Sequence, residues 1–329
     1  MVGAFAKLGN DLYTGTRSVD FIRKRKIWYV ISALAILLAI VGPMLRGGFT
    51  FGIEFTGGSQ FQVHLAQGEA LDTKPAVDVV DEVLPGSVPR ITTLGQSNIR
   101  IQTEQLVETQ AREIASELAI AYGVDESSVT SSYVGATWGQ DITRSAIKAL
   151  IVFLLFAGVV MALYFRTWKM SLAALVALLH DLVITAGIYG IAGFEVTPAA
   201  MIGFLTILGY SLYDTVVVFD KIRENTKKGE FNQKRTFGES VNLAVNQTLV
   251  RSINTSVVAM LPVGSILFIG AFMLGAGTLR DIALALFIGI IIGAYSTIFI
   301  AAPVYAQLRE NEKDIVSHDK KVLKTRELE

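Results

Sequence analysis

The sequence of 329 residues contains no cysteine, so disulfides, thiol nucleophiles and cysteine metal ligands are excluded. Charged residues are scarce as well: they make up 18% of the chain, against roughly 25% in soluble domains. The formal net charge is zero, which gives no reason to expect nucleic acid as a partner. The chain also has no phosphate-binding GxxxxGK(S/T) or GxGxxG motif. We therefore expect that the protein is not an enzyme and binds no cofactor. Energy, if it is used, would come from an ion gradient or from a partner.

Apolar residues are abundant instead, at 52% of the chain. About 20 consecutive apolar residues suffice to cross the hydrocarbon core of a membrane. The first such stretch begins too far from the N-terminus for a cleavable signal peptide. We expect a polytopic α-helical membrane protein with six transmembrane helices, the last five of them in a bundle over 146–306. The six stretches are 27–45, 146–165, 171–192, 198–219, 248–270 and 281–304.

Basic residues lie mainly on one side of these spans. Because Lys and Arg are enriched in cytoplasmic loops, we expect the N-terminus 1–26, the loop 220–247 and the tail 307–329 to be cytoplasmic. Together with the turn at 166–169, these segments hold 20 basic and 12 acidic residues. The long segment 46–145 and the hairpin before span four hold 6 basic and 14 acidic residues, and we place them outside. The tail is charged, and we expect it to be partly disordered.

The segment 46–145 is long enough to form a small extracytoplasmic domain between transmembrane helices 1 and 2. Its apolar residues alternate in some stretches and recur at helical spacing in others, and Gly and Pro separate the stretches. The resulting order is β-α-β-β-α-β, which predicts a ferredoxin-like α+β domain. The expected elements are 49–65, 74–84, 88–94, 98–103, 107–122 and 128–134.

Ionisable residues within the spans are rare, and each is a candidate functional residue because burying charge in a bilayer is costly. His180 and Asp181 lie at the middle of span three, and Asp214 lies near the cytoplasmic end of span four. Arg251 lies near the cytoplasmic start of span five, at a depth similar to that of Asp214. Asn254 follows Arg251 by one helical turn. We expect Asp214 and Arg251 to form a pair that moves protons, since desolvation favours a protonated carboxylate and a nearby guanidinium favours an ionised one.

Two structural explanations stand beside this proton-pathway interpretation. Asp214 and Arg251 would then form a structural ion pair close to the interface, with the long arginine side chain reaching toward the headgroups. His180 and Asp181 would serve only interhelical hydrogen bonds. Gly289 and Gly293 form a GxxxG spacing in span six, which favours close helix packing.

Four segments resemble the signature segments of the SecF family, membrane subunits of the bacterial protein translocase. They are FGIEFTGG at 51–58, His180-Asp181, the span-four segment 209–224 and the span-five segment 246–256. The resemblance covers nearly the whole chain in order and topology. The chain departs from the family pattern at two positions. Tyr213 stands where the family commonly has Asn, which affects local hydrogen bonding, and Glu54 stands where it has Asp and keeps the charge.

The resemblance implies a multi-pass protein of the bacterial inner membrane that forms a complex with SecD. It implies that the pair builds a resistance-nodulation-division-like assembly, associates with the SecYEG channel and the ATPase SecA, and acts on a translocating polypeptide. The proton-motive force would drive this action, with Asp214 and Arg251 in the proton pathway. A chain of six spans and one external domain is also about half of the paired-repeat transporters.

Two other functions are weighed against this one. An intramembrane aspartyl protease would need Asp181 and Asp214 as a dyad, but a Gly-x-Gly-Asp motif is lacking and the two residues differ in depth. A proton-driven small-molecule exporter subunit of the same superfamily is the alternative, although the external domain is small for a drug pocket.

Overall fold

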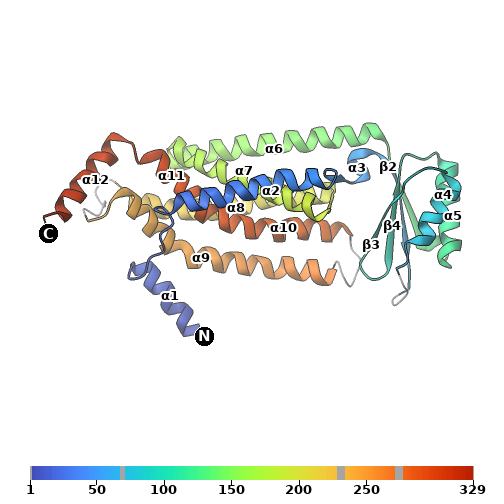
Figure 1. The fold of residues 1–329 in the computed structure, drawn as a ribbon, viewed down its shortest axis with the longest axis horizontal. Coiled ribbons are helices and arrows are strands. Elements are labelled where there is room, and N and C mark those ends of the chain that lie inside the picture. Colours follow the sequence, from blue (N-terminus) through green and yellow to red (C-terminus); the bar gives the residue numbers. More distant parts are fainter. Residues whose placement is uncertain (1, 67–70, 228–233, 271–276, 329) are drawn as a thin grey trace.

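The computed structural model describes residues 2–66, 71–227, 234–270 and 277–328. Among these residues, six helices are long and apolar enough to cross a membrane, which confirms the six predicted spans of a multi-pass membrane protein. They run alongside one another as a bundle, with a smaller α/β domain at one end and both chain termini at the other (Figure 1). We call these the domain end and the terminal end. The spans are α2 (Arg25–Leu45), α6 (Ala136–Phe165), α7 (Trp168–Ala192), α8 (Pro198–Asn225), α9 (Phe237–Ser265) with the π-helical turn η2 (Ile266–Gly270), and α10 (Gly277–Ser296) with η3 (Thr297–Ala301) and α11 (Ala302–Arg309).

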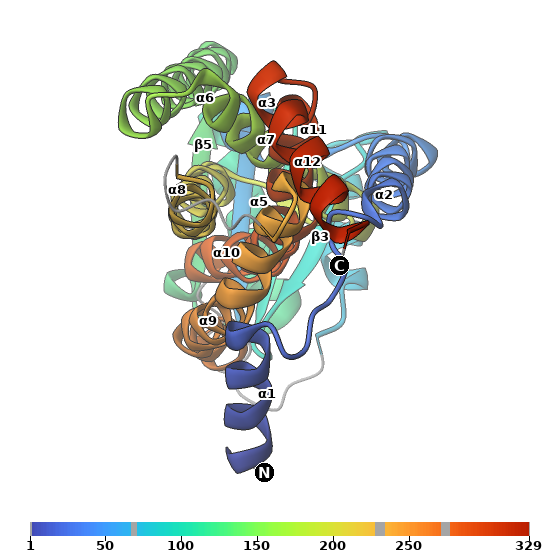
Figure 2. The same cartoon turned by 90° about the vertical axis from the view of Figure 1, so that its left-hand side faces the viewer.

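The spanning helices differ in how much of their surface the chain itself covers. Helices α7, α8 and α10 form the centre, where about half of the apolar stretch is buried (56%, 50% and 44%). Seen along the bundle axis, α2, α6 and α9 lie around them (Figure 2), and at most 17% of their apolar stretches is buried. The outer faces of these three helices are therefore left for lipid or for a partner.

Small residues let the central helices approach closely, as the GxxxG spacing predicts. Gly289 of α10 packs against Ile207 of α8, and Gly293 lies against Ser211 one turn further along. Gly187 of α7 packs against the backbone of Ala39 in α2 in the same way. A side chain at any of these glycines would hold the two helices apart.

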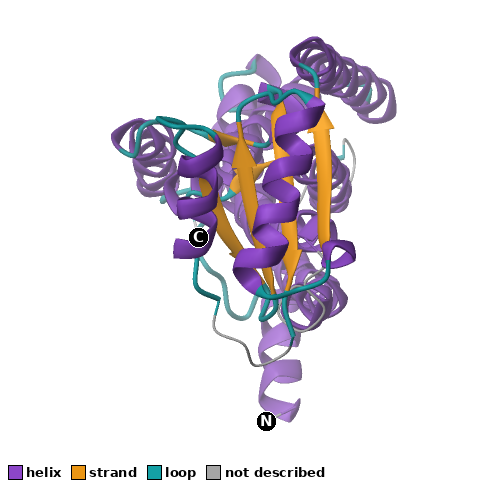
Figure 3. Cartoon of the chain, turned by 90° about the vertical axis from the view of Figure 1, so that its right-hand side faces the viewer, coloured by secondary structure: helices purple, strands orange, loops and turns teal. Residues whose placement is uncertain are grey.

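The domain contains one four-stranded antiparallel sheet in the order β3-β4-β2-β5. Along the chain its elements follow the predicted order β-α-β-β-α-β. Two helices cover the face of the sheet that points away from the bundle (Figure 3). Phe61, Ile99 and Ile101 of the two central strands pack with Ile114 and Leu118 in its core. The elements are β2 (Gly58–His64), α4 (Lys74–Val83), β3 (Arg90–Leu94), β4 (Asn98–Thr103), α5 (Glu108–Tyr122), η1 (Glu126–Ser128) and β5 (Val129–Val134).

A polar junction joins this domain to the bundle. Strand β1 (Thr50–Phe51), which precedes the short helix α3 (Ile53–Thr56), pairs in parallel with β6 (Glu195–Val196) between α7 and α8. Arg100 of β4 donates to Glu195 over 2.9 Å, and Gln102 donates to the other oxygen of the same carboxylate over 2.6 Å. Burial, and to a lesser extent the nearby Glu195 carboxylate, raises the pKa of Glu54 above its ordinary value.

Several expected boundaries differ from the structure. The expected strand 49–65 is interrupted by α3, and only Gly58–His64 joins the four-stranded sheet. Helix α6 begins at Ala136, ten residues before the predicted span, because polar residues continue the helix beyond the apolar stretch. The expected loop 220–247 is mostly helical, since α8 extends to Asn225 and α9 begins at Phe237. Lys228 in that loop, and residues 271–276 of the predicted hairpin at 271–280, lie outside the described residues.

The terminal end is also more ordered than expected. Helix α1 (Val2–Thr14) precedes α2, and the tail expected to be partly disordered forms helix α12 (Lys313–Arg326). Ile315 and Val322 of α12 are buried, so an apolar face within a charged segment holds it in place. Arg309 donates to Glu312, which also accepts from Lys169 and whose pKa these bonds lower.

Candidate functional site

Asp214 lies on the central helix α8 and is 6% exposed. Helix α8 starts at Pro198, where Thr197 caps the first turn by accepting from the backbone N–H of Ala200. The Ser252 hydroxyl of α9 donates to Asp214 Oδ1 over 2.9 Å. The second oxygen, Oδ2, is buried and has no hydrogen-bond partner among the described residues. The carboxylate therefore has one anchored oxygen and one oxygen open to a proton.

Arg251 does not form the expected ion pair with Asp214 within the described chain. Successive residues of an α-helix point about 100° apart. Ser252 faces α8, so Arg251 is turned to the outer surface of α9, where it is exposed. Asn254 is exposed on the same face one turn further on. The Arg251 guanidinium still acts electrostatically on the Asp214 carboxylate, but the two groups form no direct ion pair among the described residues.

His180 and Asp181 of α7 are both buried. The Ser211 hydroxyl of α8 donates to Asp181 Oδ2 over 2.5 Å, and Oδ1 of the same carboxylate is 3.3 Å from His180 Nδ1. The His180 ring stacks on Tyr295 with 5.9 Å between ring centroids. Its Nε2 is buried without a hydrogen-bond partner among the described residues. Of the hydrogen bonds among these contacts, only that between Ser211 and Asp181 joins two helices, and one ring nitrogen of His180 is left available.

Helix α8 connects the two carboxylates. Ser211 and Asp214 lie one turn apart on it. Ser211 bonds Asp181 of α7, and Asp214 bonds Ser252 of α9. The next residue, Thr215, makes a 3.0 Å hydroxyl contact with Thr297 of η3. We call the chain Asp181, Ser211, Asp214 and Ser252 the polar seam. Carboxylates can take up and release protons, and hydroxyl groups can donate and accept hydrogen bonds beside them. No metal-binding cluster is found among the described residues.

Two residues of the candidate site were not singled out by the sequence. Ser252 lies between Arg251 and Asn254, and Tyr295 lies in the apolar span six. A serine or tyrosine in a spanning segment is ordinary, so neither gives a signal alone. The helical spacing from Ser252 to the buried Ser256 is the pattern that could have indicated the face of α9 turned toward α8. No hydrogen bond joins Asp181 to Asp214 in the described chain, which argues against an aspartyl protease dyad.

Comparisons with known proteins agree on one family. The model of the C-terminal region of SecD/SecF protein export membrane proteins matches residues 114–311, and the SecD/SecF GG motif matches residues 45–69. The protein translocase subunit SecF of Streptomyces coelicolor is 44% identical, over 97% of this chain and 84% of that protein. SecF of Mycobacterium tuberculosis strain H37Rv is 40% identical, over 98% of this chain and 75% of that protein. None of these relatives favours the small-molecule exporter alternative.

A solved structure has the same fold. The crystal structure of Thermus SecDF, described as a translocon-associated membrane protein, matches with a TM-score of 0.76 and 28% identity. The match covers 90% of this chain and 39% of the SecDF chain. The protein translocase subunit SecDF of Thermus thermophilus is 32% identical over 87% of this chain and 38% of that protein. With a family model that matches more than half of its length and SecF relatives along nearly all of it, the chain belongs to the SecD/SecF family of protein export membrane proteins.

Proposed function

We propose that the chain is a SecF-like auxiliary subunit of the protein-export machinery, which acts with SecD and uses the proton-motive force to promote protein translocation. One observation carries the proposal. A buried carboxylate with a free oxygen, Asp214, is anchored by Ser252, while the adjacent Arg251 is exposed on the outer surface of a spanning helix. A charge exposed at this depth is costly in lipid, so a protein partner is expected to cover it.

The outer face of α9 has the form of a partner surface. Arg251 and Asn254 share it with Val258 and Leu261, which are 65% and 64% exposed. Spacings of three, four and three residues place all four side chains on one stripe of the helix. The SecDF relatives suggest the occupant, because this chain matches only about two fifths of their length. We infer that SecD supplies the helices that cover this stripe.

Proton coupling follows from the same arrangement. When the partner draws Arg251 away from α8, Asp214 lacks a balancing charge and its free oxygen takes up a proton. When Arg251 returns, the ionised carboxylate is favoured and the proton leaves. One charge that crosses 100 mV supplies about 2.3 kcal/mol, so a few protons could drive a large conformational change. The proton gradient is then the energy source, and no cofactor is needed. Asn254, His180 and Asp181 extend the same pathway.

The charge distribution supports an orientation. The basic segments lie at the terminal end, so we place both termini, the 220–247 connection and the 307–329 tail in the cytoplasm of a bacterium, with the bundle in its inner membrane. The domain within 46–145 then lies outside, and its antiparallel sheet order supports a ferredoxin-like domain. There it would meet the translocating polypeptide as this leaves SecYEG after the SecA-driven step.

Replacing Asp214 by Asn tests this function. Asn keeps an oxygen that accepts from Ser252, so the helices stay packed, but it can neither take up nor release a proton. We expect the Asp214→Asn variant, reconstituted with SecD, SecYEG and SecA, to lose the stimulation of protein export by an imposed proton gradient. ATP-driven export without the gradient should be unchanged.

The matched control is Asp220→Asn, which removes the same charge from α8 where the side chain accepts from Tyr164 outside the polar seam. This variant should keep the gradient-dependent stimulation. Full stimulation in the Asp214→Asn variant would show that the seam does not carry protons.

A further inference from the structure

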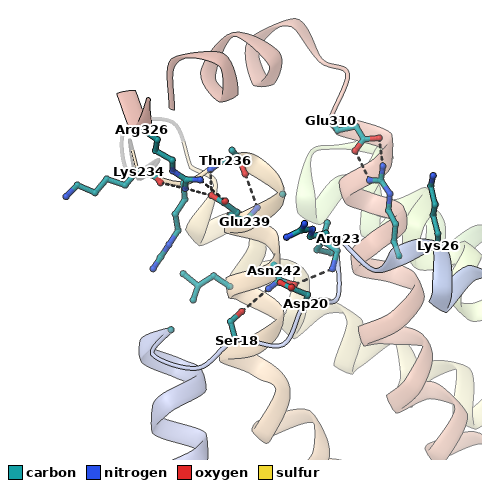
Figure 4. A pocket seen from close by; sticks show the side chains of 16 residues that line it. Ser18, Asp20, Arg23, Lys26, Lys234, Thr236, Glu239, Asn242, Glu310 and Arg326 are labelled. Carbon is teal, nitrogen blue, oxygen red and sulfur yellow. Dashed lines mark hydrogen bonds and ion pairs between the residues drawn. The ribbon is translucent and has the colours of Figure 1, made fainter. Parts of the chain in front are cut away.

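The terminal end of the bundle contains a hollow of about 720 Å³ (Figure 4). The segment before α2, the first turns of α9 and residues from either end of the tail form its walls. Its volume falls within the range of roughly 300–1,000 Å³ that is usual for ligand pockets. The polar seam does not contribute to it, and the proposed proton pathway gives it no role.

The hollow has an excess of positive charge. Six basic and three acidic side chains line it. Two of the acids are neutralised within the wall: Arg25 forms a 2.6 Å ion pair with Glu310, and Arg326 forms one with Glu239. The third acid, Asp20, is exposed. The remaining cations are Arg23, Lys26, Lys234 and Arg235.

Three of these cations have no partner within the described chain. No hydrogen bond or ion pair to a described residue engages the side chains of Arg23, Lys26 or Arg235. Arg23 and Lys26 come from the segment before α2, whereas Arg235 comes from the segment before α9, so the charges face the hollow from two walls. Cations gathered from separate segments without internal partners are typical of a site for an anion.

The walls are held in place before any ligand binds. Asn242 of α9 accepts from the backbone N–H of Phe21 over 2.8 Å, and Asn246 accepts from that of Val19 over 2.8 Å. These bonds fix the segment that carries Arg23 against α9. The N-terminus of α9 itself lies at the hollow, and its dipole adds partial positive charge there. Little ordering is therefore needed when an anion binds.

The position of the hollow indicates where the anion comes from. Arg25 and Lys26 are the first two residues of the spanning helix α2, so the hollow lies where the chain leaves the hydrocarbon and meets the lipid headgroups. Basic pockets at this level between spanning helices suit lipid phosphates, and arginine pairs with phosphate through two parallel hydrogen bonds. We propose that this hollow binds the phosphate of an anionic phospholipid headgroup.

The test uses the full chain in nanodiscs of phosphatidylcholine alone or with phosphatidylglycerol, and native mass spectrometry to measure the phosphatidylglycerol that stays bound. The Arg23→Gln/Arg235→Gln variant should retain about tenfold less of it, the effect of losing charge-assisted hydrogen bonds. Since neither side chain has a partner among the described residues, the melting temperature in phosphatidylcholine should be unchanged. Asp20→Asn, which removes the unpaired acid, should increase retention.

The matched control is Lys24→Gln/Lys227→Gln. Both lysines are exposed at the same end of the bundle, but neither lines the hollow. An equal loss in this control would mean that general positive charge attracts the lipid, and would overturn the proposal. Full retention in the Arg23→Gln/Arg235→Gln variant would overturn it as well. In phosphatidylcholine nanodiscs, inorganic phosphate should give no thermal stabilisation; if it stabilises as well as phosphatidylglycerol does, the site takes phosphate from solution and the lipid is not its source.

Discussion

At the scale of single residues, one hydroxyl group sets the geometry of the candidate site. The Ser252 bond to Asp214 turns that face of α9 toward α8, and Arg251, about 100° further around the helix, is left on the outer surface. Within the described chain, Asp214 therefore bonds the neutral Ser252 and forms no direct ion pair with Arg251. If Asp214 and Arg251 pair only after a helix or a side chain moves, the pair is better suited to a switch than a permanent ion pair would be.

Arg251→Ala tests whether this arginine acts as part of that switch. The side chain is exposed and makes no hydrogen bond or ion pair within the described chain. We therefore expect the melting temperature of the variant in detergent to stay within about 2 °C of the parent, as for surface changes within about 0.5 kcal/mol. Gradient-driven stimulation of export should fall nearly as far as in the Asp214→Asn variant.

The comparison variant is Arg223→Ala, which removes an exposed cation from the end of α8. It should leave stimulation intact. If Arg251→Ala keeps its stimulation too, the arginine is reduced to a contact residue for the partner.

The ionisable residues of the site could be predicted from sequence, because a charge within an apolar run stands out. Asp214, His180 and Asp181 are buried in the bundle as expected. The direction in which Arg251 points could not be predicted. Neighbouring residues differ by about 100° around a helix, and only the packing partner decides which of them faces inward.

At the scale of elements, glycines decide how closely the helices pack. An added Cβ at Gly187 would overlap the backbone of Ala39 in α2, which cannot move aside as a flexible side chain can. An added Cβ at Gly209 of α8 would meet no other atom within 4 Å. One glycine thus serves a close contact between α7 and α2, while the other does not.

Gly187→Ala should destabilise the bundle by about 1–3 kcal/mol, the usual cost of inserting atoms into a packed contact. Gly209→Ala should be neutral, or stabilising by up to about 1 kcal/mol, since alanine is the better helix former. Thermal unfolding of the two variants in the same detergent measures the difference. Equal melting temperatures would show that α2 can separate from α7 without cost.

The number and order of the helices could be predicted, but their ends could not. Hydropathy detects only the part of a helix that lies in hydrocarbon. It therefore places the polar first turns of α6 in the domain and those of α9 in a loop. The start of α9 did have a local signal. Thr236 and Glu239 form a capping box, in which each side chain bonds the backbone N–H of the other. Helix α12 could not be found in this way, because the residue before it, Glu312, makes no side-chain cap.

At the scale of the whole molecule, the α/β domain is held to the bundle by a buried ion pair. The side chains of Arg100 and Glu195 are only 11% and 7% exposed, and they come from the domain and from the connection between α7 and α8. A buried pair is costly to break, because the remaining charge has no compensation. The position of the domain and the packing of the bundle are therefore linked.

Arg100→Met should destabilise this junction by about 3–5 kcal/mol, the usual effect of leaving one buried charge without its partner. We expect faster hydrogen exchange in β1 and β6, measured by mass spectrometry, with no change in the core of the domain. Arg112→Met serves as the control, since the Arg112–Glu108 pair lies in the same domain but both side chains are 80% exposed. Such exposed pairs contribute about 0–1 kcal/mol. Unchanged exchange in β1 and β6 of the Arg100→Met variant would mean that strand pairing alone holds the junction.

The early start of α6 has a mechanical consequence. Its 30 residues form one helix of about 45 Å, longer than the roughly 30 Å of a hydrocarbon core. At its first turns Gly139 packs directly on the backbone of Phe55 in α3, beside the domain. Helix α6 is packed against the domain at its start and is uninterrupted along its length. It therefore has no hinge that could absorb a displacement. Tension on the α/β domain would thus shift the whole helix, and the shift would reach the turn between α6 and α7 at the terminal end of the bundle.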